Sequence, residues 1–176
     1  MHMNSEILSV ARKKFKSYLK DKEILDIVLF GSAVKGKILP NDIDVAFITD
    51  KKIEDAEGFH VSVLKPEEFF ANPPLLVNTL LREGYSLKYH RFFSENYKFS
   101  NKVLFIYILS GLNSSQKVKT VNFLRGINGK KGIVEENKGR WLANGVFIMP
   151  IETEHLIGQF LINAKIKFQK SYILMH

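Results

Sequence analysis

The sequence predicts an α/β (α+β) protein of two domains, with a mixed sheet and helices in residues 1–90 and a smaller basic α/β domain in residues 91–176. Three observations indicate this fold class. Short apolar runs bounded by turn residues are typical of strands, and apolar residues at three- and four-residue steps are typical of helices. Positive charge is concentrated in the C-terminal part. A chain of 176 residues is long enough for one compact domain or two small ones.

The N-terminal part begins with an amphipathic helix, expected over residues 5–20. Ile7, Ala11 and Phe15 recur there at four-residue steps, and the positions between them carry lysine and arginine. The other elements expected in this part are strands at 24–30, 43–48 and 59–64, a helix starting at 65–68, a helix at 75–83 and an edge strand at 85–89.

The C-terminal part shows a second mixture of apolar runs and helical spacing. Its clearest strand is Gly145 to Pro150, an apolar run that a proline ends. The other elements expected are an apolar stretch at 103–109, a helix containing 118–124, a glycine-rich turn at 126–132, a helix at 151–164 and a closing strand at 165–174.

The net charge of +8 is unevenly distributed along the chain. Residues 1–100 hold 15 Lys and Arg against 14 Asp and Glu, whereas residues 101–176 hold 11 against four. Such asymmetry favours a polyanionic partner, and nucleic acid is favoured over a membrane because there is no long basic helix with an aromatic face. A lysine-rich solvated surface is the alternative.

The composition limits the chemistry and the location of the protein. The chain contains no cysteine, which excludes disulfides, thiolate zinc sites and cysteine nucleophiles. No window reaches the roughly 18 uninterrupted apolar residues of a spanning helix, and the N-terminus does not resemble a signal peptide. We therefore expect a cytoplasmic protein with no membrane partner.

Two short motifs carry chemical information. Asp42 and Asp44 stand two residues apart at the expected second strand, so their carboxylates should project from the same face. Mg²⁺ prefers one or two carboxylates together with phosphate oxygens and water. Upstream, Gly31-Ser32 ends the first strand, where a residue without a side chain lets phosphate approach backbone N–H groups. Lys35 lies in the same connection and is either a partner for phosphate charge or a solvated lysine.

In combination, the segments 29–36 and 41–45 resemble the signature of minimal nucleotidyltransferases of the DNA polymerase β superfamily. The resemblance covers about residues 5–90, and the C-terminal part has no recognised relative. It implies transfer of a nucleoside monophosphate from an NTP such as ATP to a hydroxyl of RNA, protein or a small molecule. It also implies that Gly31, Ser32 and Lys35 bind the nucleotide and that Asp42 and Asp44 are catalytic ligands of Mg²⁺ or Mn²⁺.

One position departs from the family pattern. The family usually supplies a third carboxylate from the following strand, and counting back from Lys65 places that position on His60. Histidine can ligate a metal or act as a general base, because it exchanges a proton near neutral pH. The alternative is a catalytically degenerate protein that senses nucleotide and binds nucleic acid as a regulator.

The C-terminal part offers four candidate contacts to nucleic acid: Lys130, Lys131, Lys138 and Arg140. The first two lie in the glycine-rich turn, where lysines and backbone amides could meet phosphate. Arg140 stands beside Trp141, a pairing found on single-strand binding surfaces as well as in ordinary cores. The alternative is that the turn is only a connection.

Overall fold

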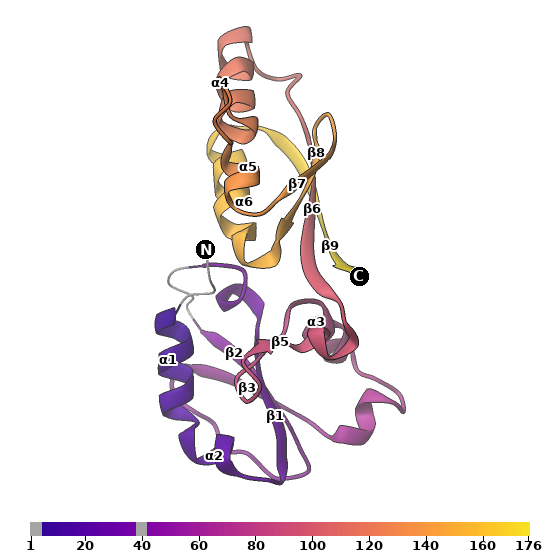
Figure 1. Ribbon diagram of the computed structural model, residues 1–176. Coiled ribbons are helices and arrows are strands. Elements are labelled where there is room, and N and C mark those ends of the chain that lie inside the picture. Colours follow the sequence, from indigo (N-terminus) through magenta and orange to yellow (C-terminus); the bar gives the residue numbers. More distant parts are fainter. Residues whose placement is uncertain (1–4, 38–41) are drawn as a thin grey trace. The chain divides into compact units, whose positions relative to one another are not determined.

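A computed structural model describes residues 5–37 and 42–176 of the chain. The described residues form two compact units. The first unit runs to Asn101 and includes Leu174–His176, and the second unit is Lys102–Ile173. Each unit contains its own sheet, of five strands in the first and four in the second (Figure 1). The predicted α/β class with a mixed sheet and a second, smaller α/β unit is confirmed; the domain boundary at residue 90 stays a prediction.

The sheet of the first unit has the strand order β3-β2-β1-β4-β5. Strands β2 and β3 run parallel, and every other neighbouring pair is antiparallel. The sheet is therefore mixed, with β1 and β2 paired on both sides. The strands are β1 Ile24–Phe30, β2 Ile43–Thr49, β3 Phe59–Leu64, β4 Tyr85–Ser86 and β5 Arg91–Phe92.

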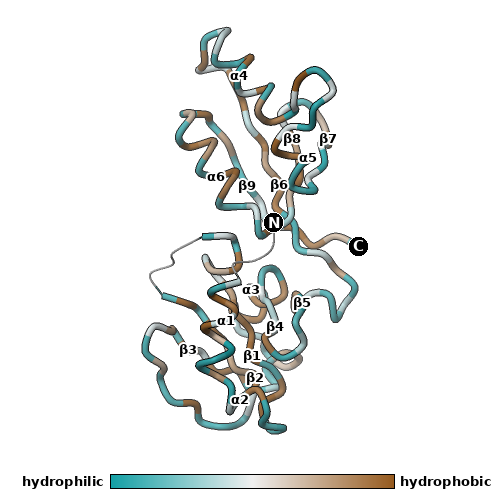
Figure 2. Tube along the Cα trace, turned by 60° about the vertical axis from the view of Figure 1, so that its left-hand side comes forward, coloured by the Kyte–Doolittle hydropathy of each residue, from teal (hydrophilic) through white to brown (hydrophobic). Residues whose placement is uncertain are grey.

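Helices cover both faces of this sheet, with α1 (Ser5–Lys14) and α2 (Lys16–Lys20) on one side and α3 (Leu75–Glu83) on the other (Figure 1). Alternate residues of β1 and β2 enter the two cores: Leu29 packs with the α1 and α2 side, and Val28 with the α3 side. Burial on both faces explains why these strands read as continuous apolar runs, drawn largely in brown in Figure 2.

The first helix differs from the expectation of one helix over residues 5–20. It divides at Phe15, whose ψ of 20° departs from helical geometry. The Phe15 ring is only 2% exposed and packs edge-on against Phe47 and Phe59 at 5.2 and 4.9 Å between centroids. Placing this ring in the core therefore accompanies the division into α1 and α2.

The second unit contains an antiparallel sheet with the order β7-β8-β6-β9. Buried Phe105 and Phe147 stack across β6 and β8 at 5.3 Å in its core. The short elements α5 and β7 were not expected from the sequence. The elements are β6 Ser100–Ile108, α4 Ser114–Arg125, α5 Ile133–Glu136, β7 Arg140–Ala143, β8 Val146–Pro150, α6 Glu154–Asn163 and β9 Lys167–Met175. Within the described parts of the chain, no helix has the length and apolar character needed to cross a bilayer.

Candidate active site

The end of β1 meets the beginning of β2 at Gly31. Phe30 pairs with Asp44 in the antiparallel ladder, and the chain then turns through a short 3-10 segment, Gly31–Ala33. Gly31 has φ +73°, a conformation that residues with a Cβ rarely adopt. A Cβ at this position would lie 2.3 Å from Asp44 Oδ2. The turn therefore requires glycine for its backbone angle and also for the close approach of the carboxylate.

Asp44 and His60 lie side by side on adjacent strands. The parallel register of β2 and β3 pairs them directly, and His60 Nδ1 is 3.3 Å from Asp44 Oδ1. The Asp44 side chain is 32% exposed and the His60 side chain 71%, so the pair opens to solvent. The structure thus brings together Gly31, Asp44 and His60, and the assignment of His60 to the third family position stays a prediction.

Asp42 lies just outside the strand, because β2 begins at Ile43. The residue is in a bend and is exposed. The expectation that the two carboxylates project from the same face therefore stays a prediction for Asp42. Ser32 is half-buried in the turn after Gly31, and its carbonyl accepts a hydrogen bond from the Lys37 N–H at 3.3 Å.

The donor chemistry of this site suits a divalent cation. Asp44 presents one carboxylate beside the His60 imidazole. Asp42, which directly precedes β2, is an exposed second carboxylate. These are the hard oxygen and nitrogen ligands that such ions accept. Within residues 5–37 and 42–176, no three His, Asp or Glu side chains converge into a complete metal cluster. Two carboxylates with substrate phosphates suffice for Mg²⁺.

Lys35 is held in an ion pair. Its Nζ lies 3.0 Å from Glu83 Oε2 of α3, with the two side chains only 19% and 3% exposed. A buried carboxylate needs such a partner, because an isolated charge is costly to remove from water. The assignment of Lys35 to nucleotide binding stays a prediction, and the structure shows a second use for its charge.

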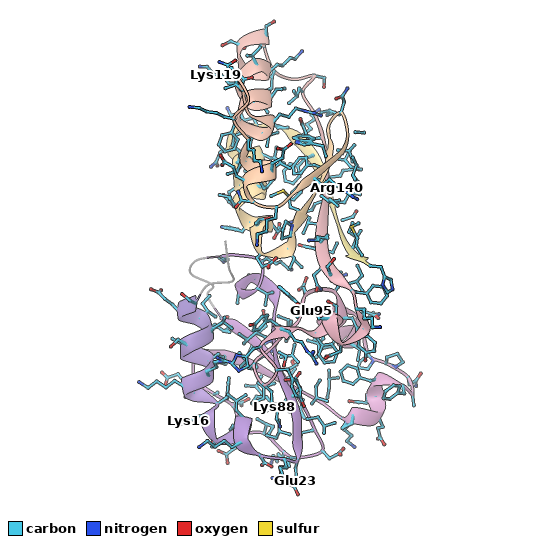
Figure 3. The ribbon with its side chains drawn as sticks, viewed as in Figure 1. Lys16, Glu23, Lys88, Glu95, Lys119 and Arg140 are labelled. Atoms are coloured by element: carbon cyan, nitrogen blue, oxygen red, sulfur yellow. The ribbon has the colours of Figure 1, made fainter. Side chains whose placement is uncertain are left out.

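The four basic candidates of the second unit are all exposed. Lys130 and Lys131 line one hollow of about 290 Å³ at the loop between α4 and α5, whereas Lys138 and Arg140 are outside its lining. Arg140 is labelled on β7 in Figure 3, while Lys119 projects from α4 of the same unit. Contacts from these residues to nucleic acid stay a prediction.

Sequence reasoning missed two acids in the first unit. Glu83 is the buried partner of Lys35, and Asp26 of β1 is 3% exposed. The sequence did contain a signal for Asp26, since it is the one charged residue in the apolar run Ile24–Phe30. A lone acid in a buried strand needs a partner or a function.

One comparison with known proteins covers the segment that contains this site. Residues 13–68 match the family model described as polymerase beta, nucleotidyltransferase. This segment is a polymerase β-type nucleotidyltransferase domain, and the remainder of the chain is unassigned. The predicted family is therefore confirmed for the segment that contains Gly31, Asp44 and His60. No curated protein and no solved structure matches the chain.

Proposed function

We propose that this protein is a metal-dependent nucleotidyltransferase that moves a nucleoside monophosphate from an NTP to a hydroxyl acceptor. The observation that supports this most strongly is the contact between the glycine turn and Asp44, where a Cβ on Gly31 would lie 2.3 Å from the carboxylate oxygen. A triphosphate held along that turn would have its reacting phosphorus beside the carboxylate. The family match of residues 13–68 places the same segment among nucleotidyltransferases.

Different residues of the site would bind the phosphates and the metal ion. Backbone N–H groups at Gly31 and the Ser32 hydroxyl would bind phosphate oxygens. Asp42 and Asp44 would hold Mg²⁺ or Mn²⁺, with His60 adjoining. When bound, the ion would neutralise charge on the phosphates. The acceptor oxygen bonds to the α-phosphorus, the bond from that phosphorus to the bridging oxygen breaks, and pyrophosphate leaves with the electron pair.

His60 is the residue we assign to the proton of the acceptor hydroxyl. With a proton on Nδ1, the ring donates to Asp44 Oδ1 across 3.3 Å, and Nε2 is then an acceptor. The exposure of the ring gives an acceptor molecule access to it. A histidine oriented by a carboxylate is an established form of general base.

For the acceptor we favour RNA over protein or a small molecule. The second unit carries most of the excess positive charge, and Lys130, Lys131, Lys138 and Arg140 are all exposed on it. Binding through such residues depends on phosphate neutralisation and weakens steeply with salt.

The test is incubation of purified protein with each labelled NTP and Mg²⁺ or Mn²⁺, with and without RNA. Asp42→Ala/Asp44→Ala removes the proposed ligands, and Asp50→Asn, at an exposed acid just beyond β2, is the matched control. We expect label transfer and pyrophosphate release in the wild type and in the Asp50→Asn protein, with a loss on the order of 1,000-fold in the double variant.

Two outcomes would contradict the proposal. Full activity in the double variant would show that the carboxylates are not catalytic. Nucleotide binding without turnover, together with salt-sensitive RNA binding, would instead identify the protein as a nucleotide-sensing regulator.

A further inference from the structure

A pocket lies in the first unit, on the same sheet face as Asp44 but at the opposite end of β1. Its volume is about 320 Å³. Asp26 in its lining pairs with Ile48, whereas Asp44 pairs with Phe30. The two positions are four residue steps apart along β1, a spacing of roughly 13 Å at strand rise. The lining residues are Leu25, Asp26, Ile48, Pro66, Phe69, Phe70, Tyr89, Phe93, Asn96 and Tyr97.

Aromatic rings make up half of this lining. Phe93 lies 5.7 Å from Phe69 and 6.4 Å from Tyr97, measured between ring centroids. Several of the rings are unusually open to solvent, with Phe70 87% exposed, Tyr89 53% and Tyr97 48%. Clustered exposed aromatics are typical of a binding surface, since burying them would lower the free energy of the protein.

Asp26 is the one charged residue in the lining. Its Oδ1 accepts hydrogen bonds from Ser86 Oγ at 2.7 Å and from the Ile27 N–H at 2.8 Å. Its Oδ2 is buried and has no hydrogen-bond partner of normal geometry among the described residues. The residue as a whole is only 3% exposed. A buried carboxylate with one oxygen unsatisfied leaves a favourable position for a donor.

Burial raises the pKa of the Asp26 carboxyl above its ordinary value. The hydrogen bonds from Ser86 and Ile27, and the N–H and charge of Lys88, lower it by less. Lys88 is otherwise engaged, because its Nζ donates to the carbonyls of Asp21 and Ile24. The protein therefore stabilises the Asp26 charge incompletely, and an added positive group would complete it.

We infer that this pocket binds an organic cation, namely a primary ammonium or guanidinium group carried on an apolar stem. The aromatic rings would bind the stem and attract the cation through their faces. The ammonium or guanidinium group would approach the Asp26 carboxylate, whose Oδ2 is buried and, among the described residues, accepts no hydrogen bond of normal geometry. A neutral apolar ligand would use the rings alone, so the contribution of Asp26 separates the two ligand classes.

The experiment is titration of the full chain, by calorimetry, with benzylammonium and with benzyl alcohol, its uncharged counterpart. The variants are Asp26→Asn, which keeps the shape of the side chain, and Phe70→Ala, which removes an exposed ring of the lining. Leu75→Ala is the matched control, since Leu75 is 84% exposed in the same unit and lies outside the lining.

We expect wild type to bind benzylammonium about tenfold more tightly than benzyl alcohol. Asp26→Asn should abolish this preference, Phe70→Ala should weaken both ligands, and Leu75→Ala should change neither. Equal affinities in the wild type, an intact preference in Asp26→Asn, or no binding at about 10 mM would each overturn the inference. If Asp26→Asn fails to fold, an unchanged affinity in Phe70→Ala overturns it instead.

Discussion

The two ends of one sheet face hold carboxylates in opposite circumstances. At one end Asp44 is partly open to solvent, beside a glycine turn and an exposed histidine. At the other end Asp26 is buried, with a hydroxyl and an N–H on one oxygen and, among residues 5–37 and 42–176, no hydrogen bond of normal geometry on the other. Both residues stand on the side of the sheet that α3 covers, so their surroundings rather than their strand positions set the difference.

The comparison shows what each carboxylate can do. Asp44 keeps access to water, so an ion or a phosphate-bearing substrate can reach it. Asp26 has lost most of its water and would gain most from a cation delivered by a ligand. Glu83 is a third case, in which the protein supplies the cation through Lys35. The following four tests separate these cases, from the largest expected effect to the smallest.

Removing the Lys35 ammonium group, which pairs with Glu83, should destabilise the first unit. Among the described residues, Lys35→Ala leaves buried Glu83 with only the more distant Arg82 Nε, 4.0 Å from its Oε2, so we expect a loss toward the lower end of about 3–5 kcal/mol in the free energy of unfolding, measured with denaturant. Adding Glu83→Gln should recover much of that loss. Lys51→Ala is the control, because Lys51 pairs with Asp21 on the surface and should contribute little. Unchanged stability in Lys35→Ala would show that Glu83 does not depend on this ion pair.

Removing the imidazole beside Asp44 should slow transfer while leaving the fold in place. We expect His60→Ala to lower kcat by about 100-fold, the lower range for loss of a general base. Ser62→Ala, two residues further along β3, is the matched control. His60→Asp, which introduces the carboxylate that the family usually carries there, should retain more activity than His60→Ala. Unchanged kcat in His60→Ala would exclude the proposed proton transfer.

Substituting the glycine of the turn tests the close contact to Asp44. Gly31 and Gly58 share positive φ angles of +73° and +79°, but a Cβ on Gly58 would meet nothing within 4 Å. Gly58→Ala therefore carries backbone strain alone, about 1–2 kcal/mol. Gly31→Ala adds displacement of Asp44, which we expect to cost roughly 1 kcal/mol more and to reduce transfer. Equal stability and activity in the two variants would contradict the contact.

The smallest effect concerns pH and stability. Since burial raises the pKa of Asp26, the folded protein binds a proton more tightly there than the unfolded chain does. The ionised Asp26 carboxylate therefore lowers the free energy of unfolding at pH values above its pKa in the folded protein. This loss disappears as the pH falls below the ordinary pKa near 3.8. We expect wild type to gain stability relative to Asp26→Asn between neutral and acid pH, as followed by thermal unfolding. A constant difference would contradict the raised pKa.

The sequence was most informative where burial is continuous. Strands β1 and β2 were predicted almost to the residue, because both faces of each are apolar. The count that placed the third family position on His60 stays a prediction, while the structure pairs His60 with Asp44 across β2 and β3. The role of Asp42 stays a prediction, because this residue lies just before β2, where strand pairing does not fix the direction of its side chain.

Other features depend on contacts between distant residues. The pairing of Lys35 with Glu83 joins the turn after β1 to α3, and no local pattern encodes it. The strand β7 is short and mostly exposed, so it lacks the apolar run of a core strand. A signal was nevertheless present, because Asn144-Gly145 between it and β8 is a common hairpin turn.

The position of β3 at the edge of its sheet has a consequence for hydrogen exchange. Strand β2 is paired on both sides, so its amides should open only with the whole unit. Strand β3 is paired with β2 on one side, and the amides that face away from the ladder should exchange much sooner. His60 thus stands on a strand paired on one side, while Asp44 stands on a strand paired on both sides. The 3.3 Å contact between them therefore joins a strand paired on both sides to an edge strand, whose outward amides we expect to exchange sooner.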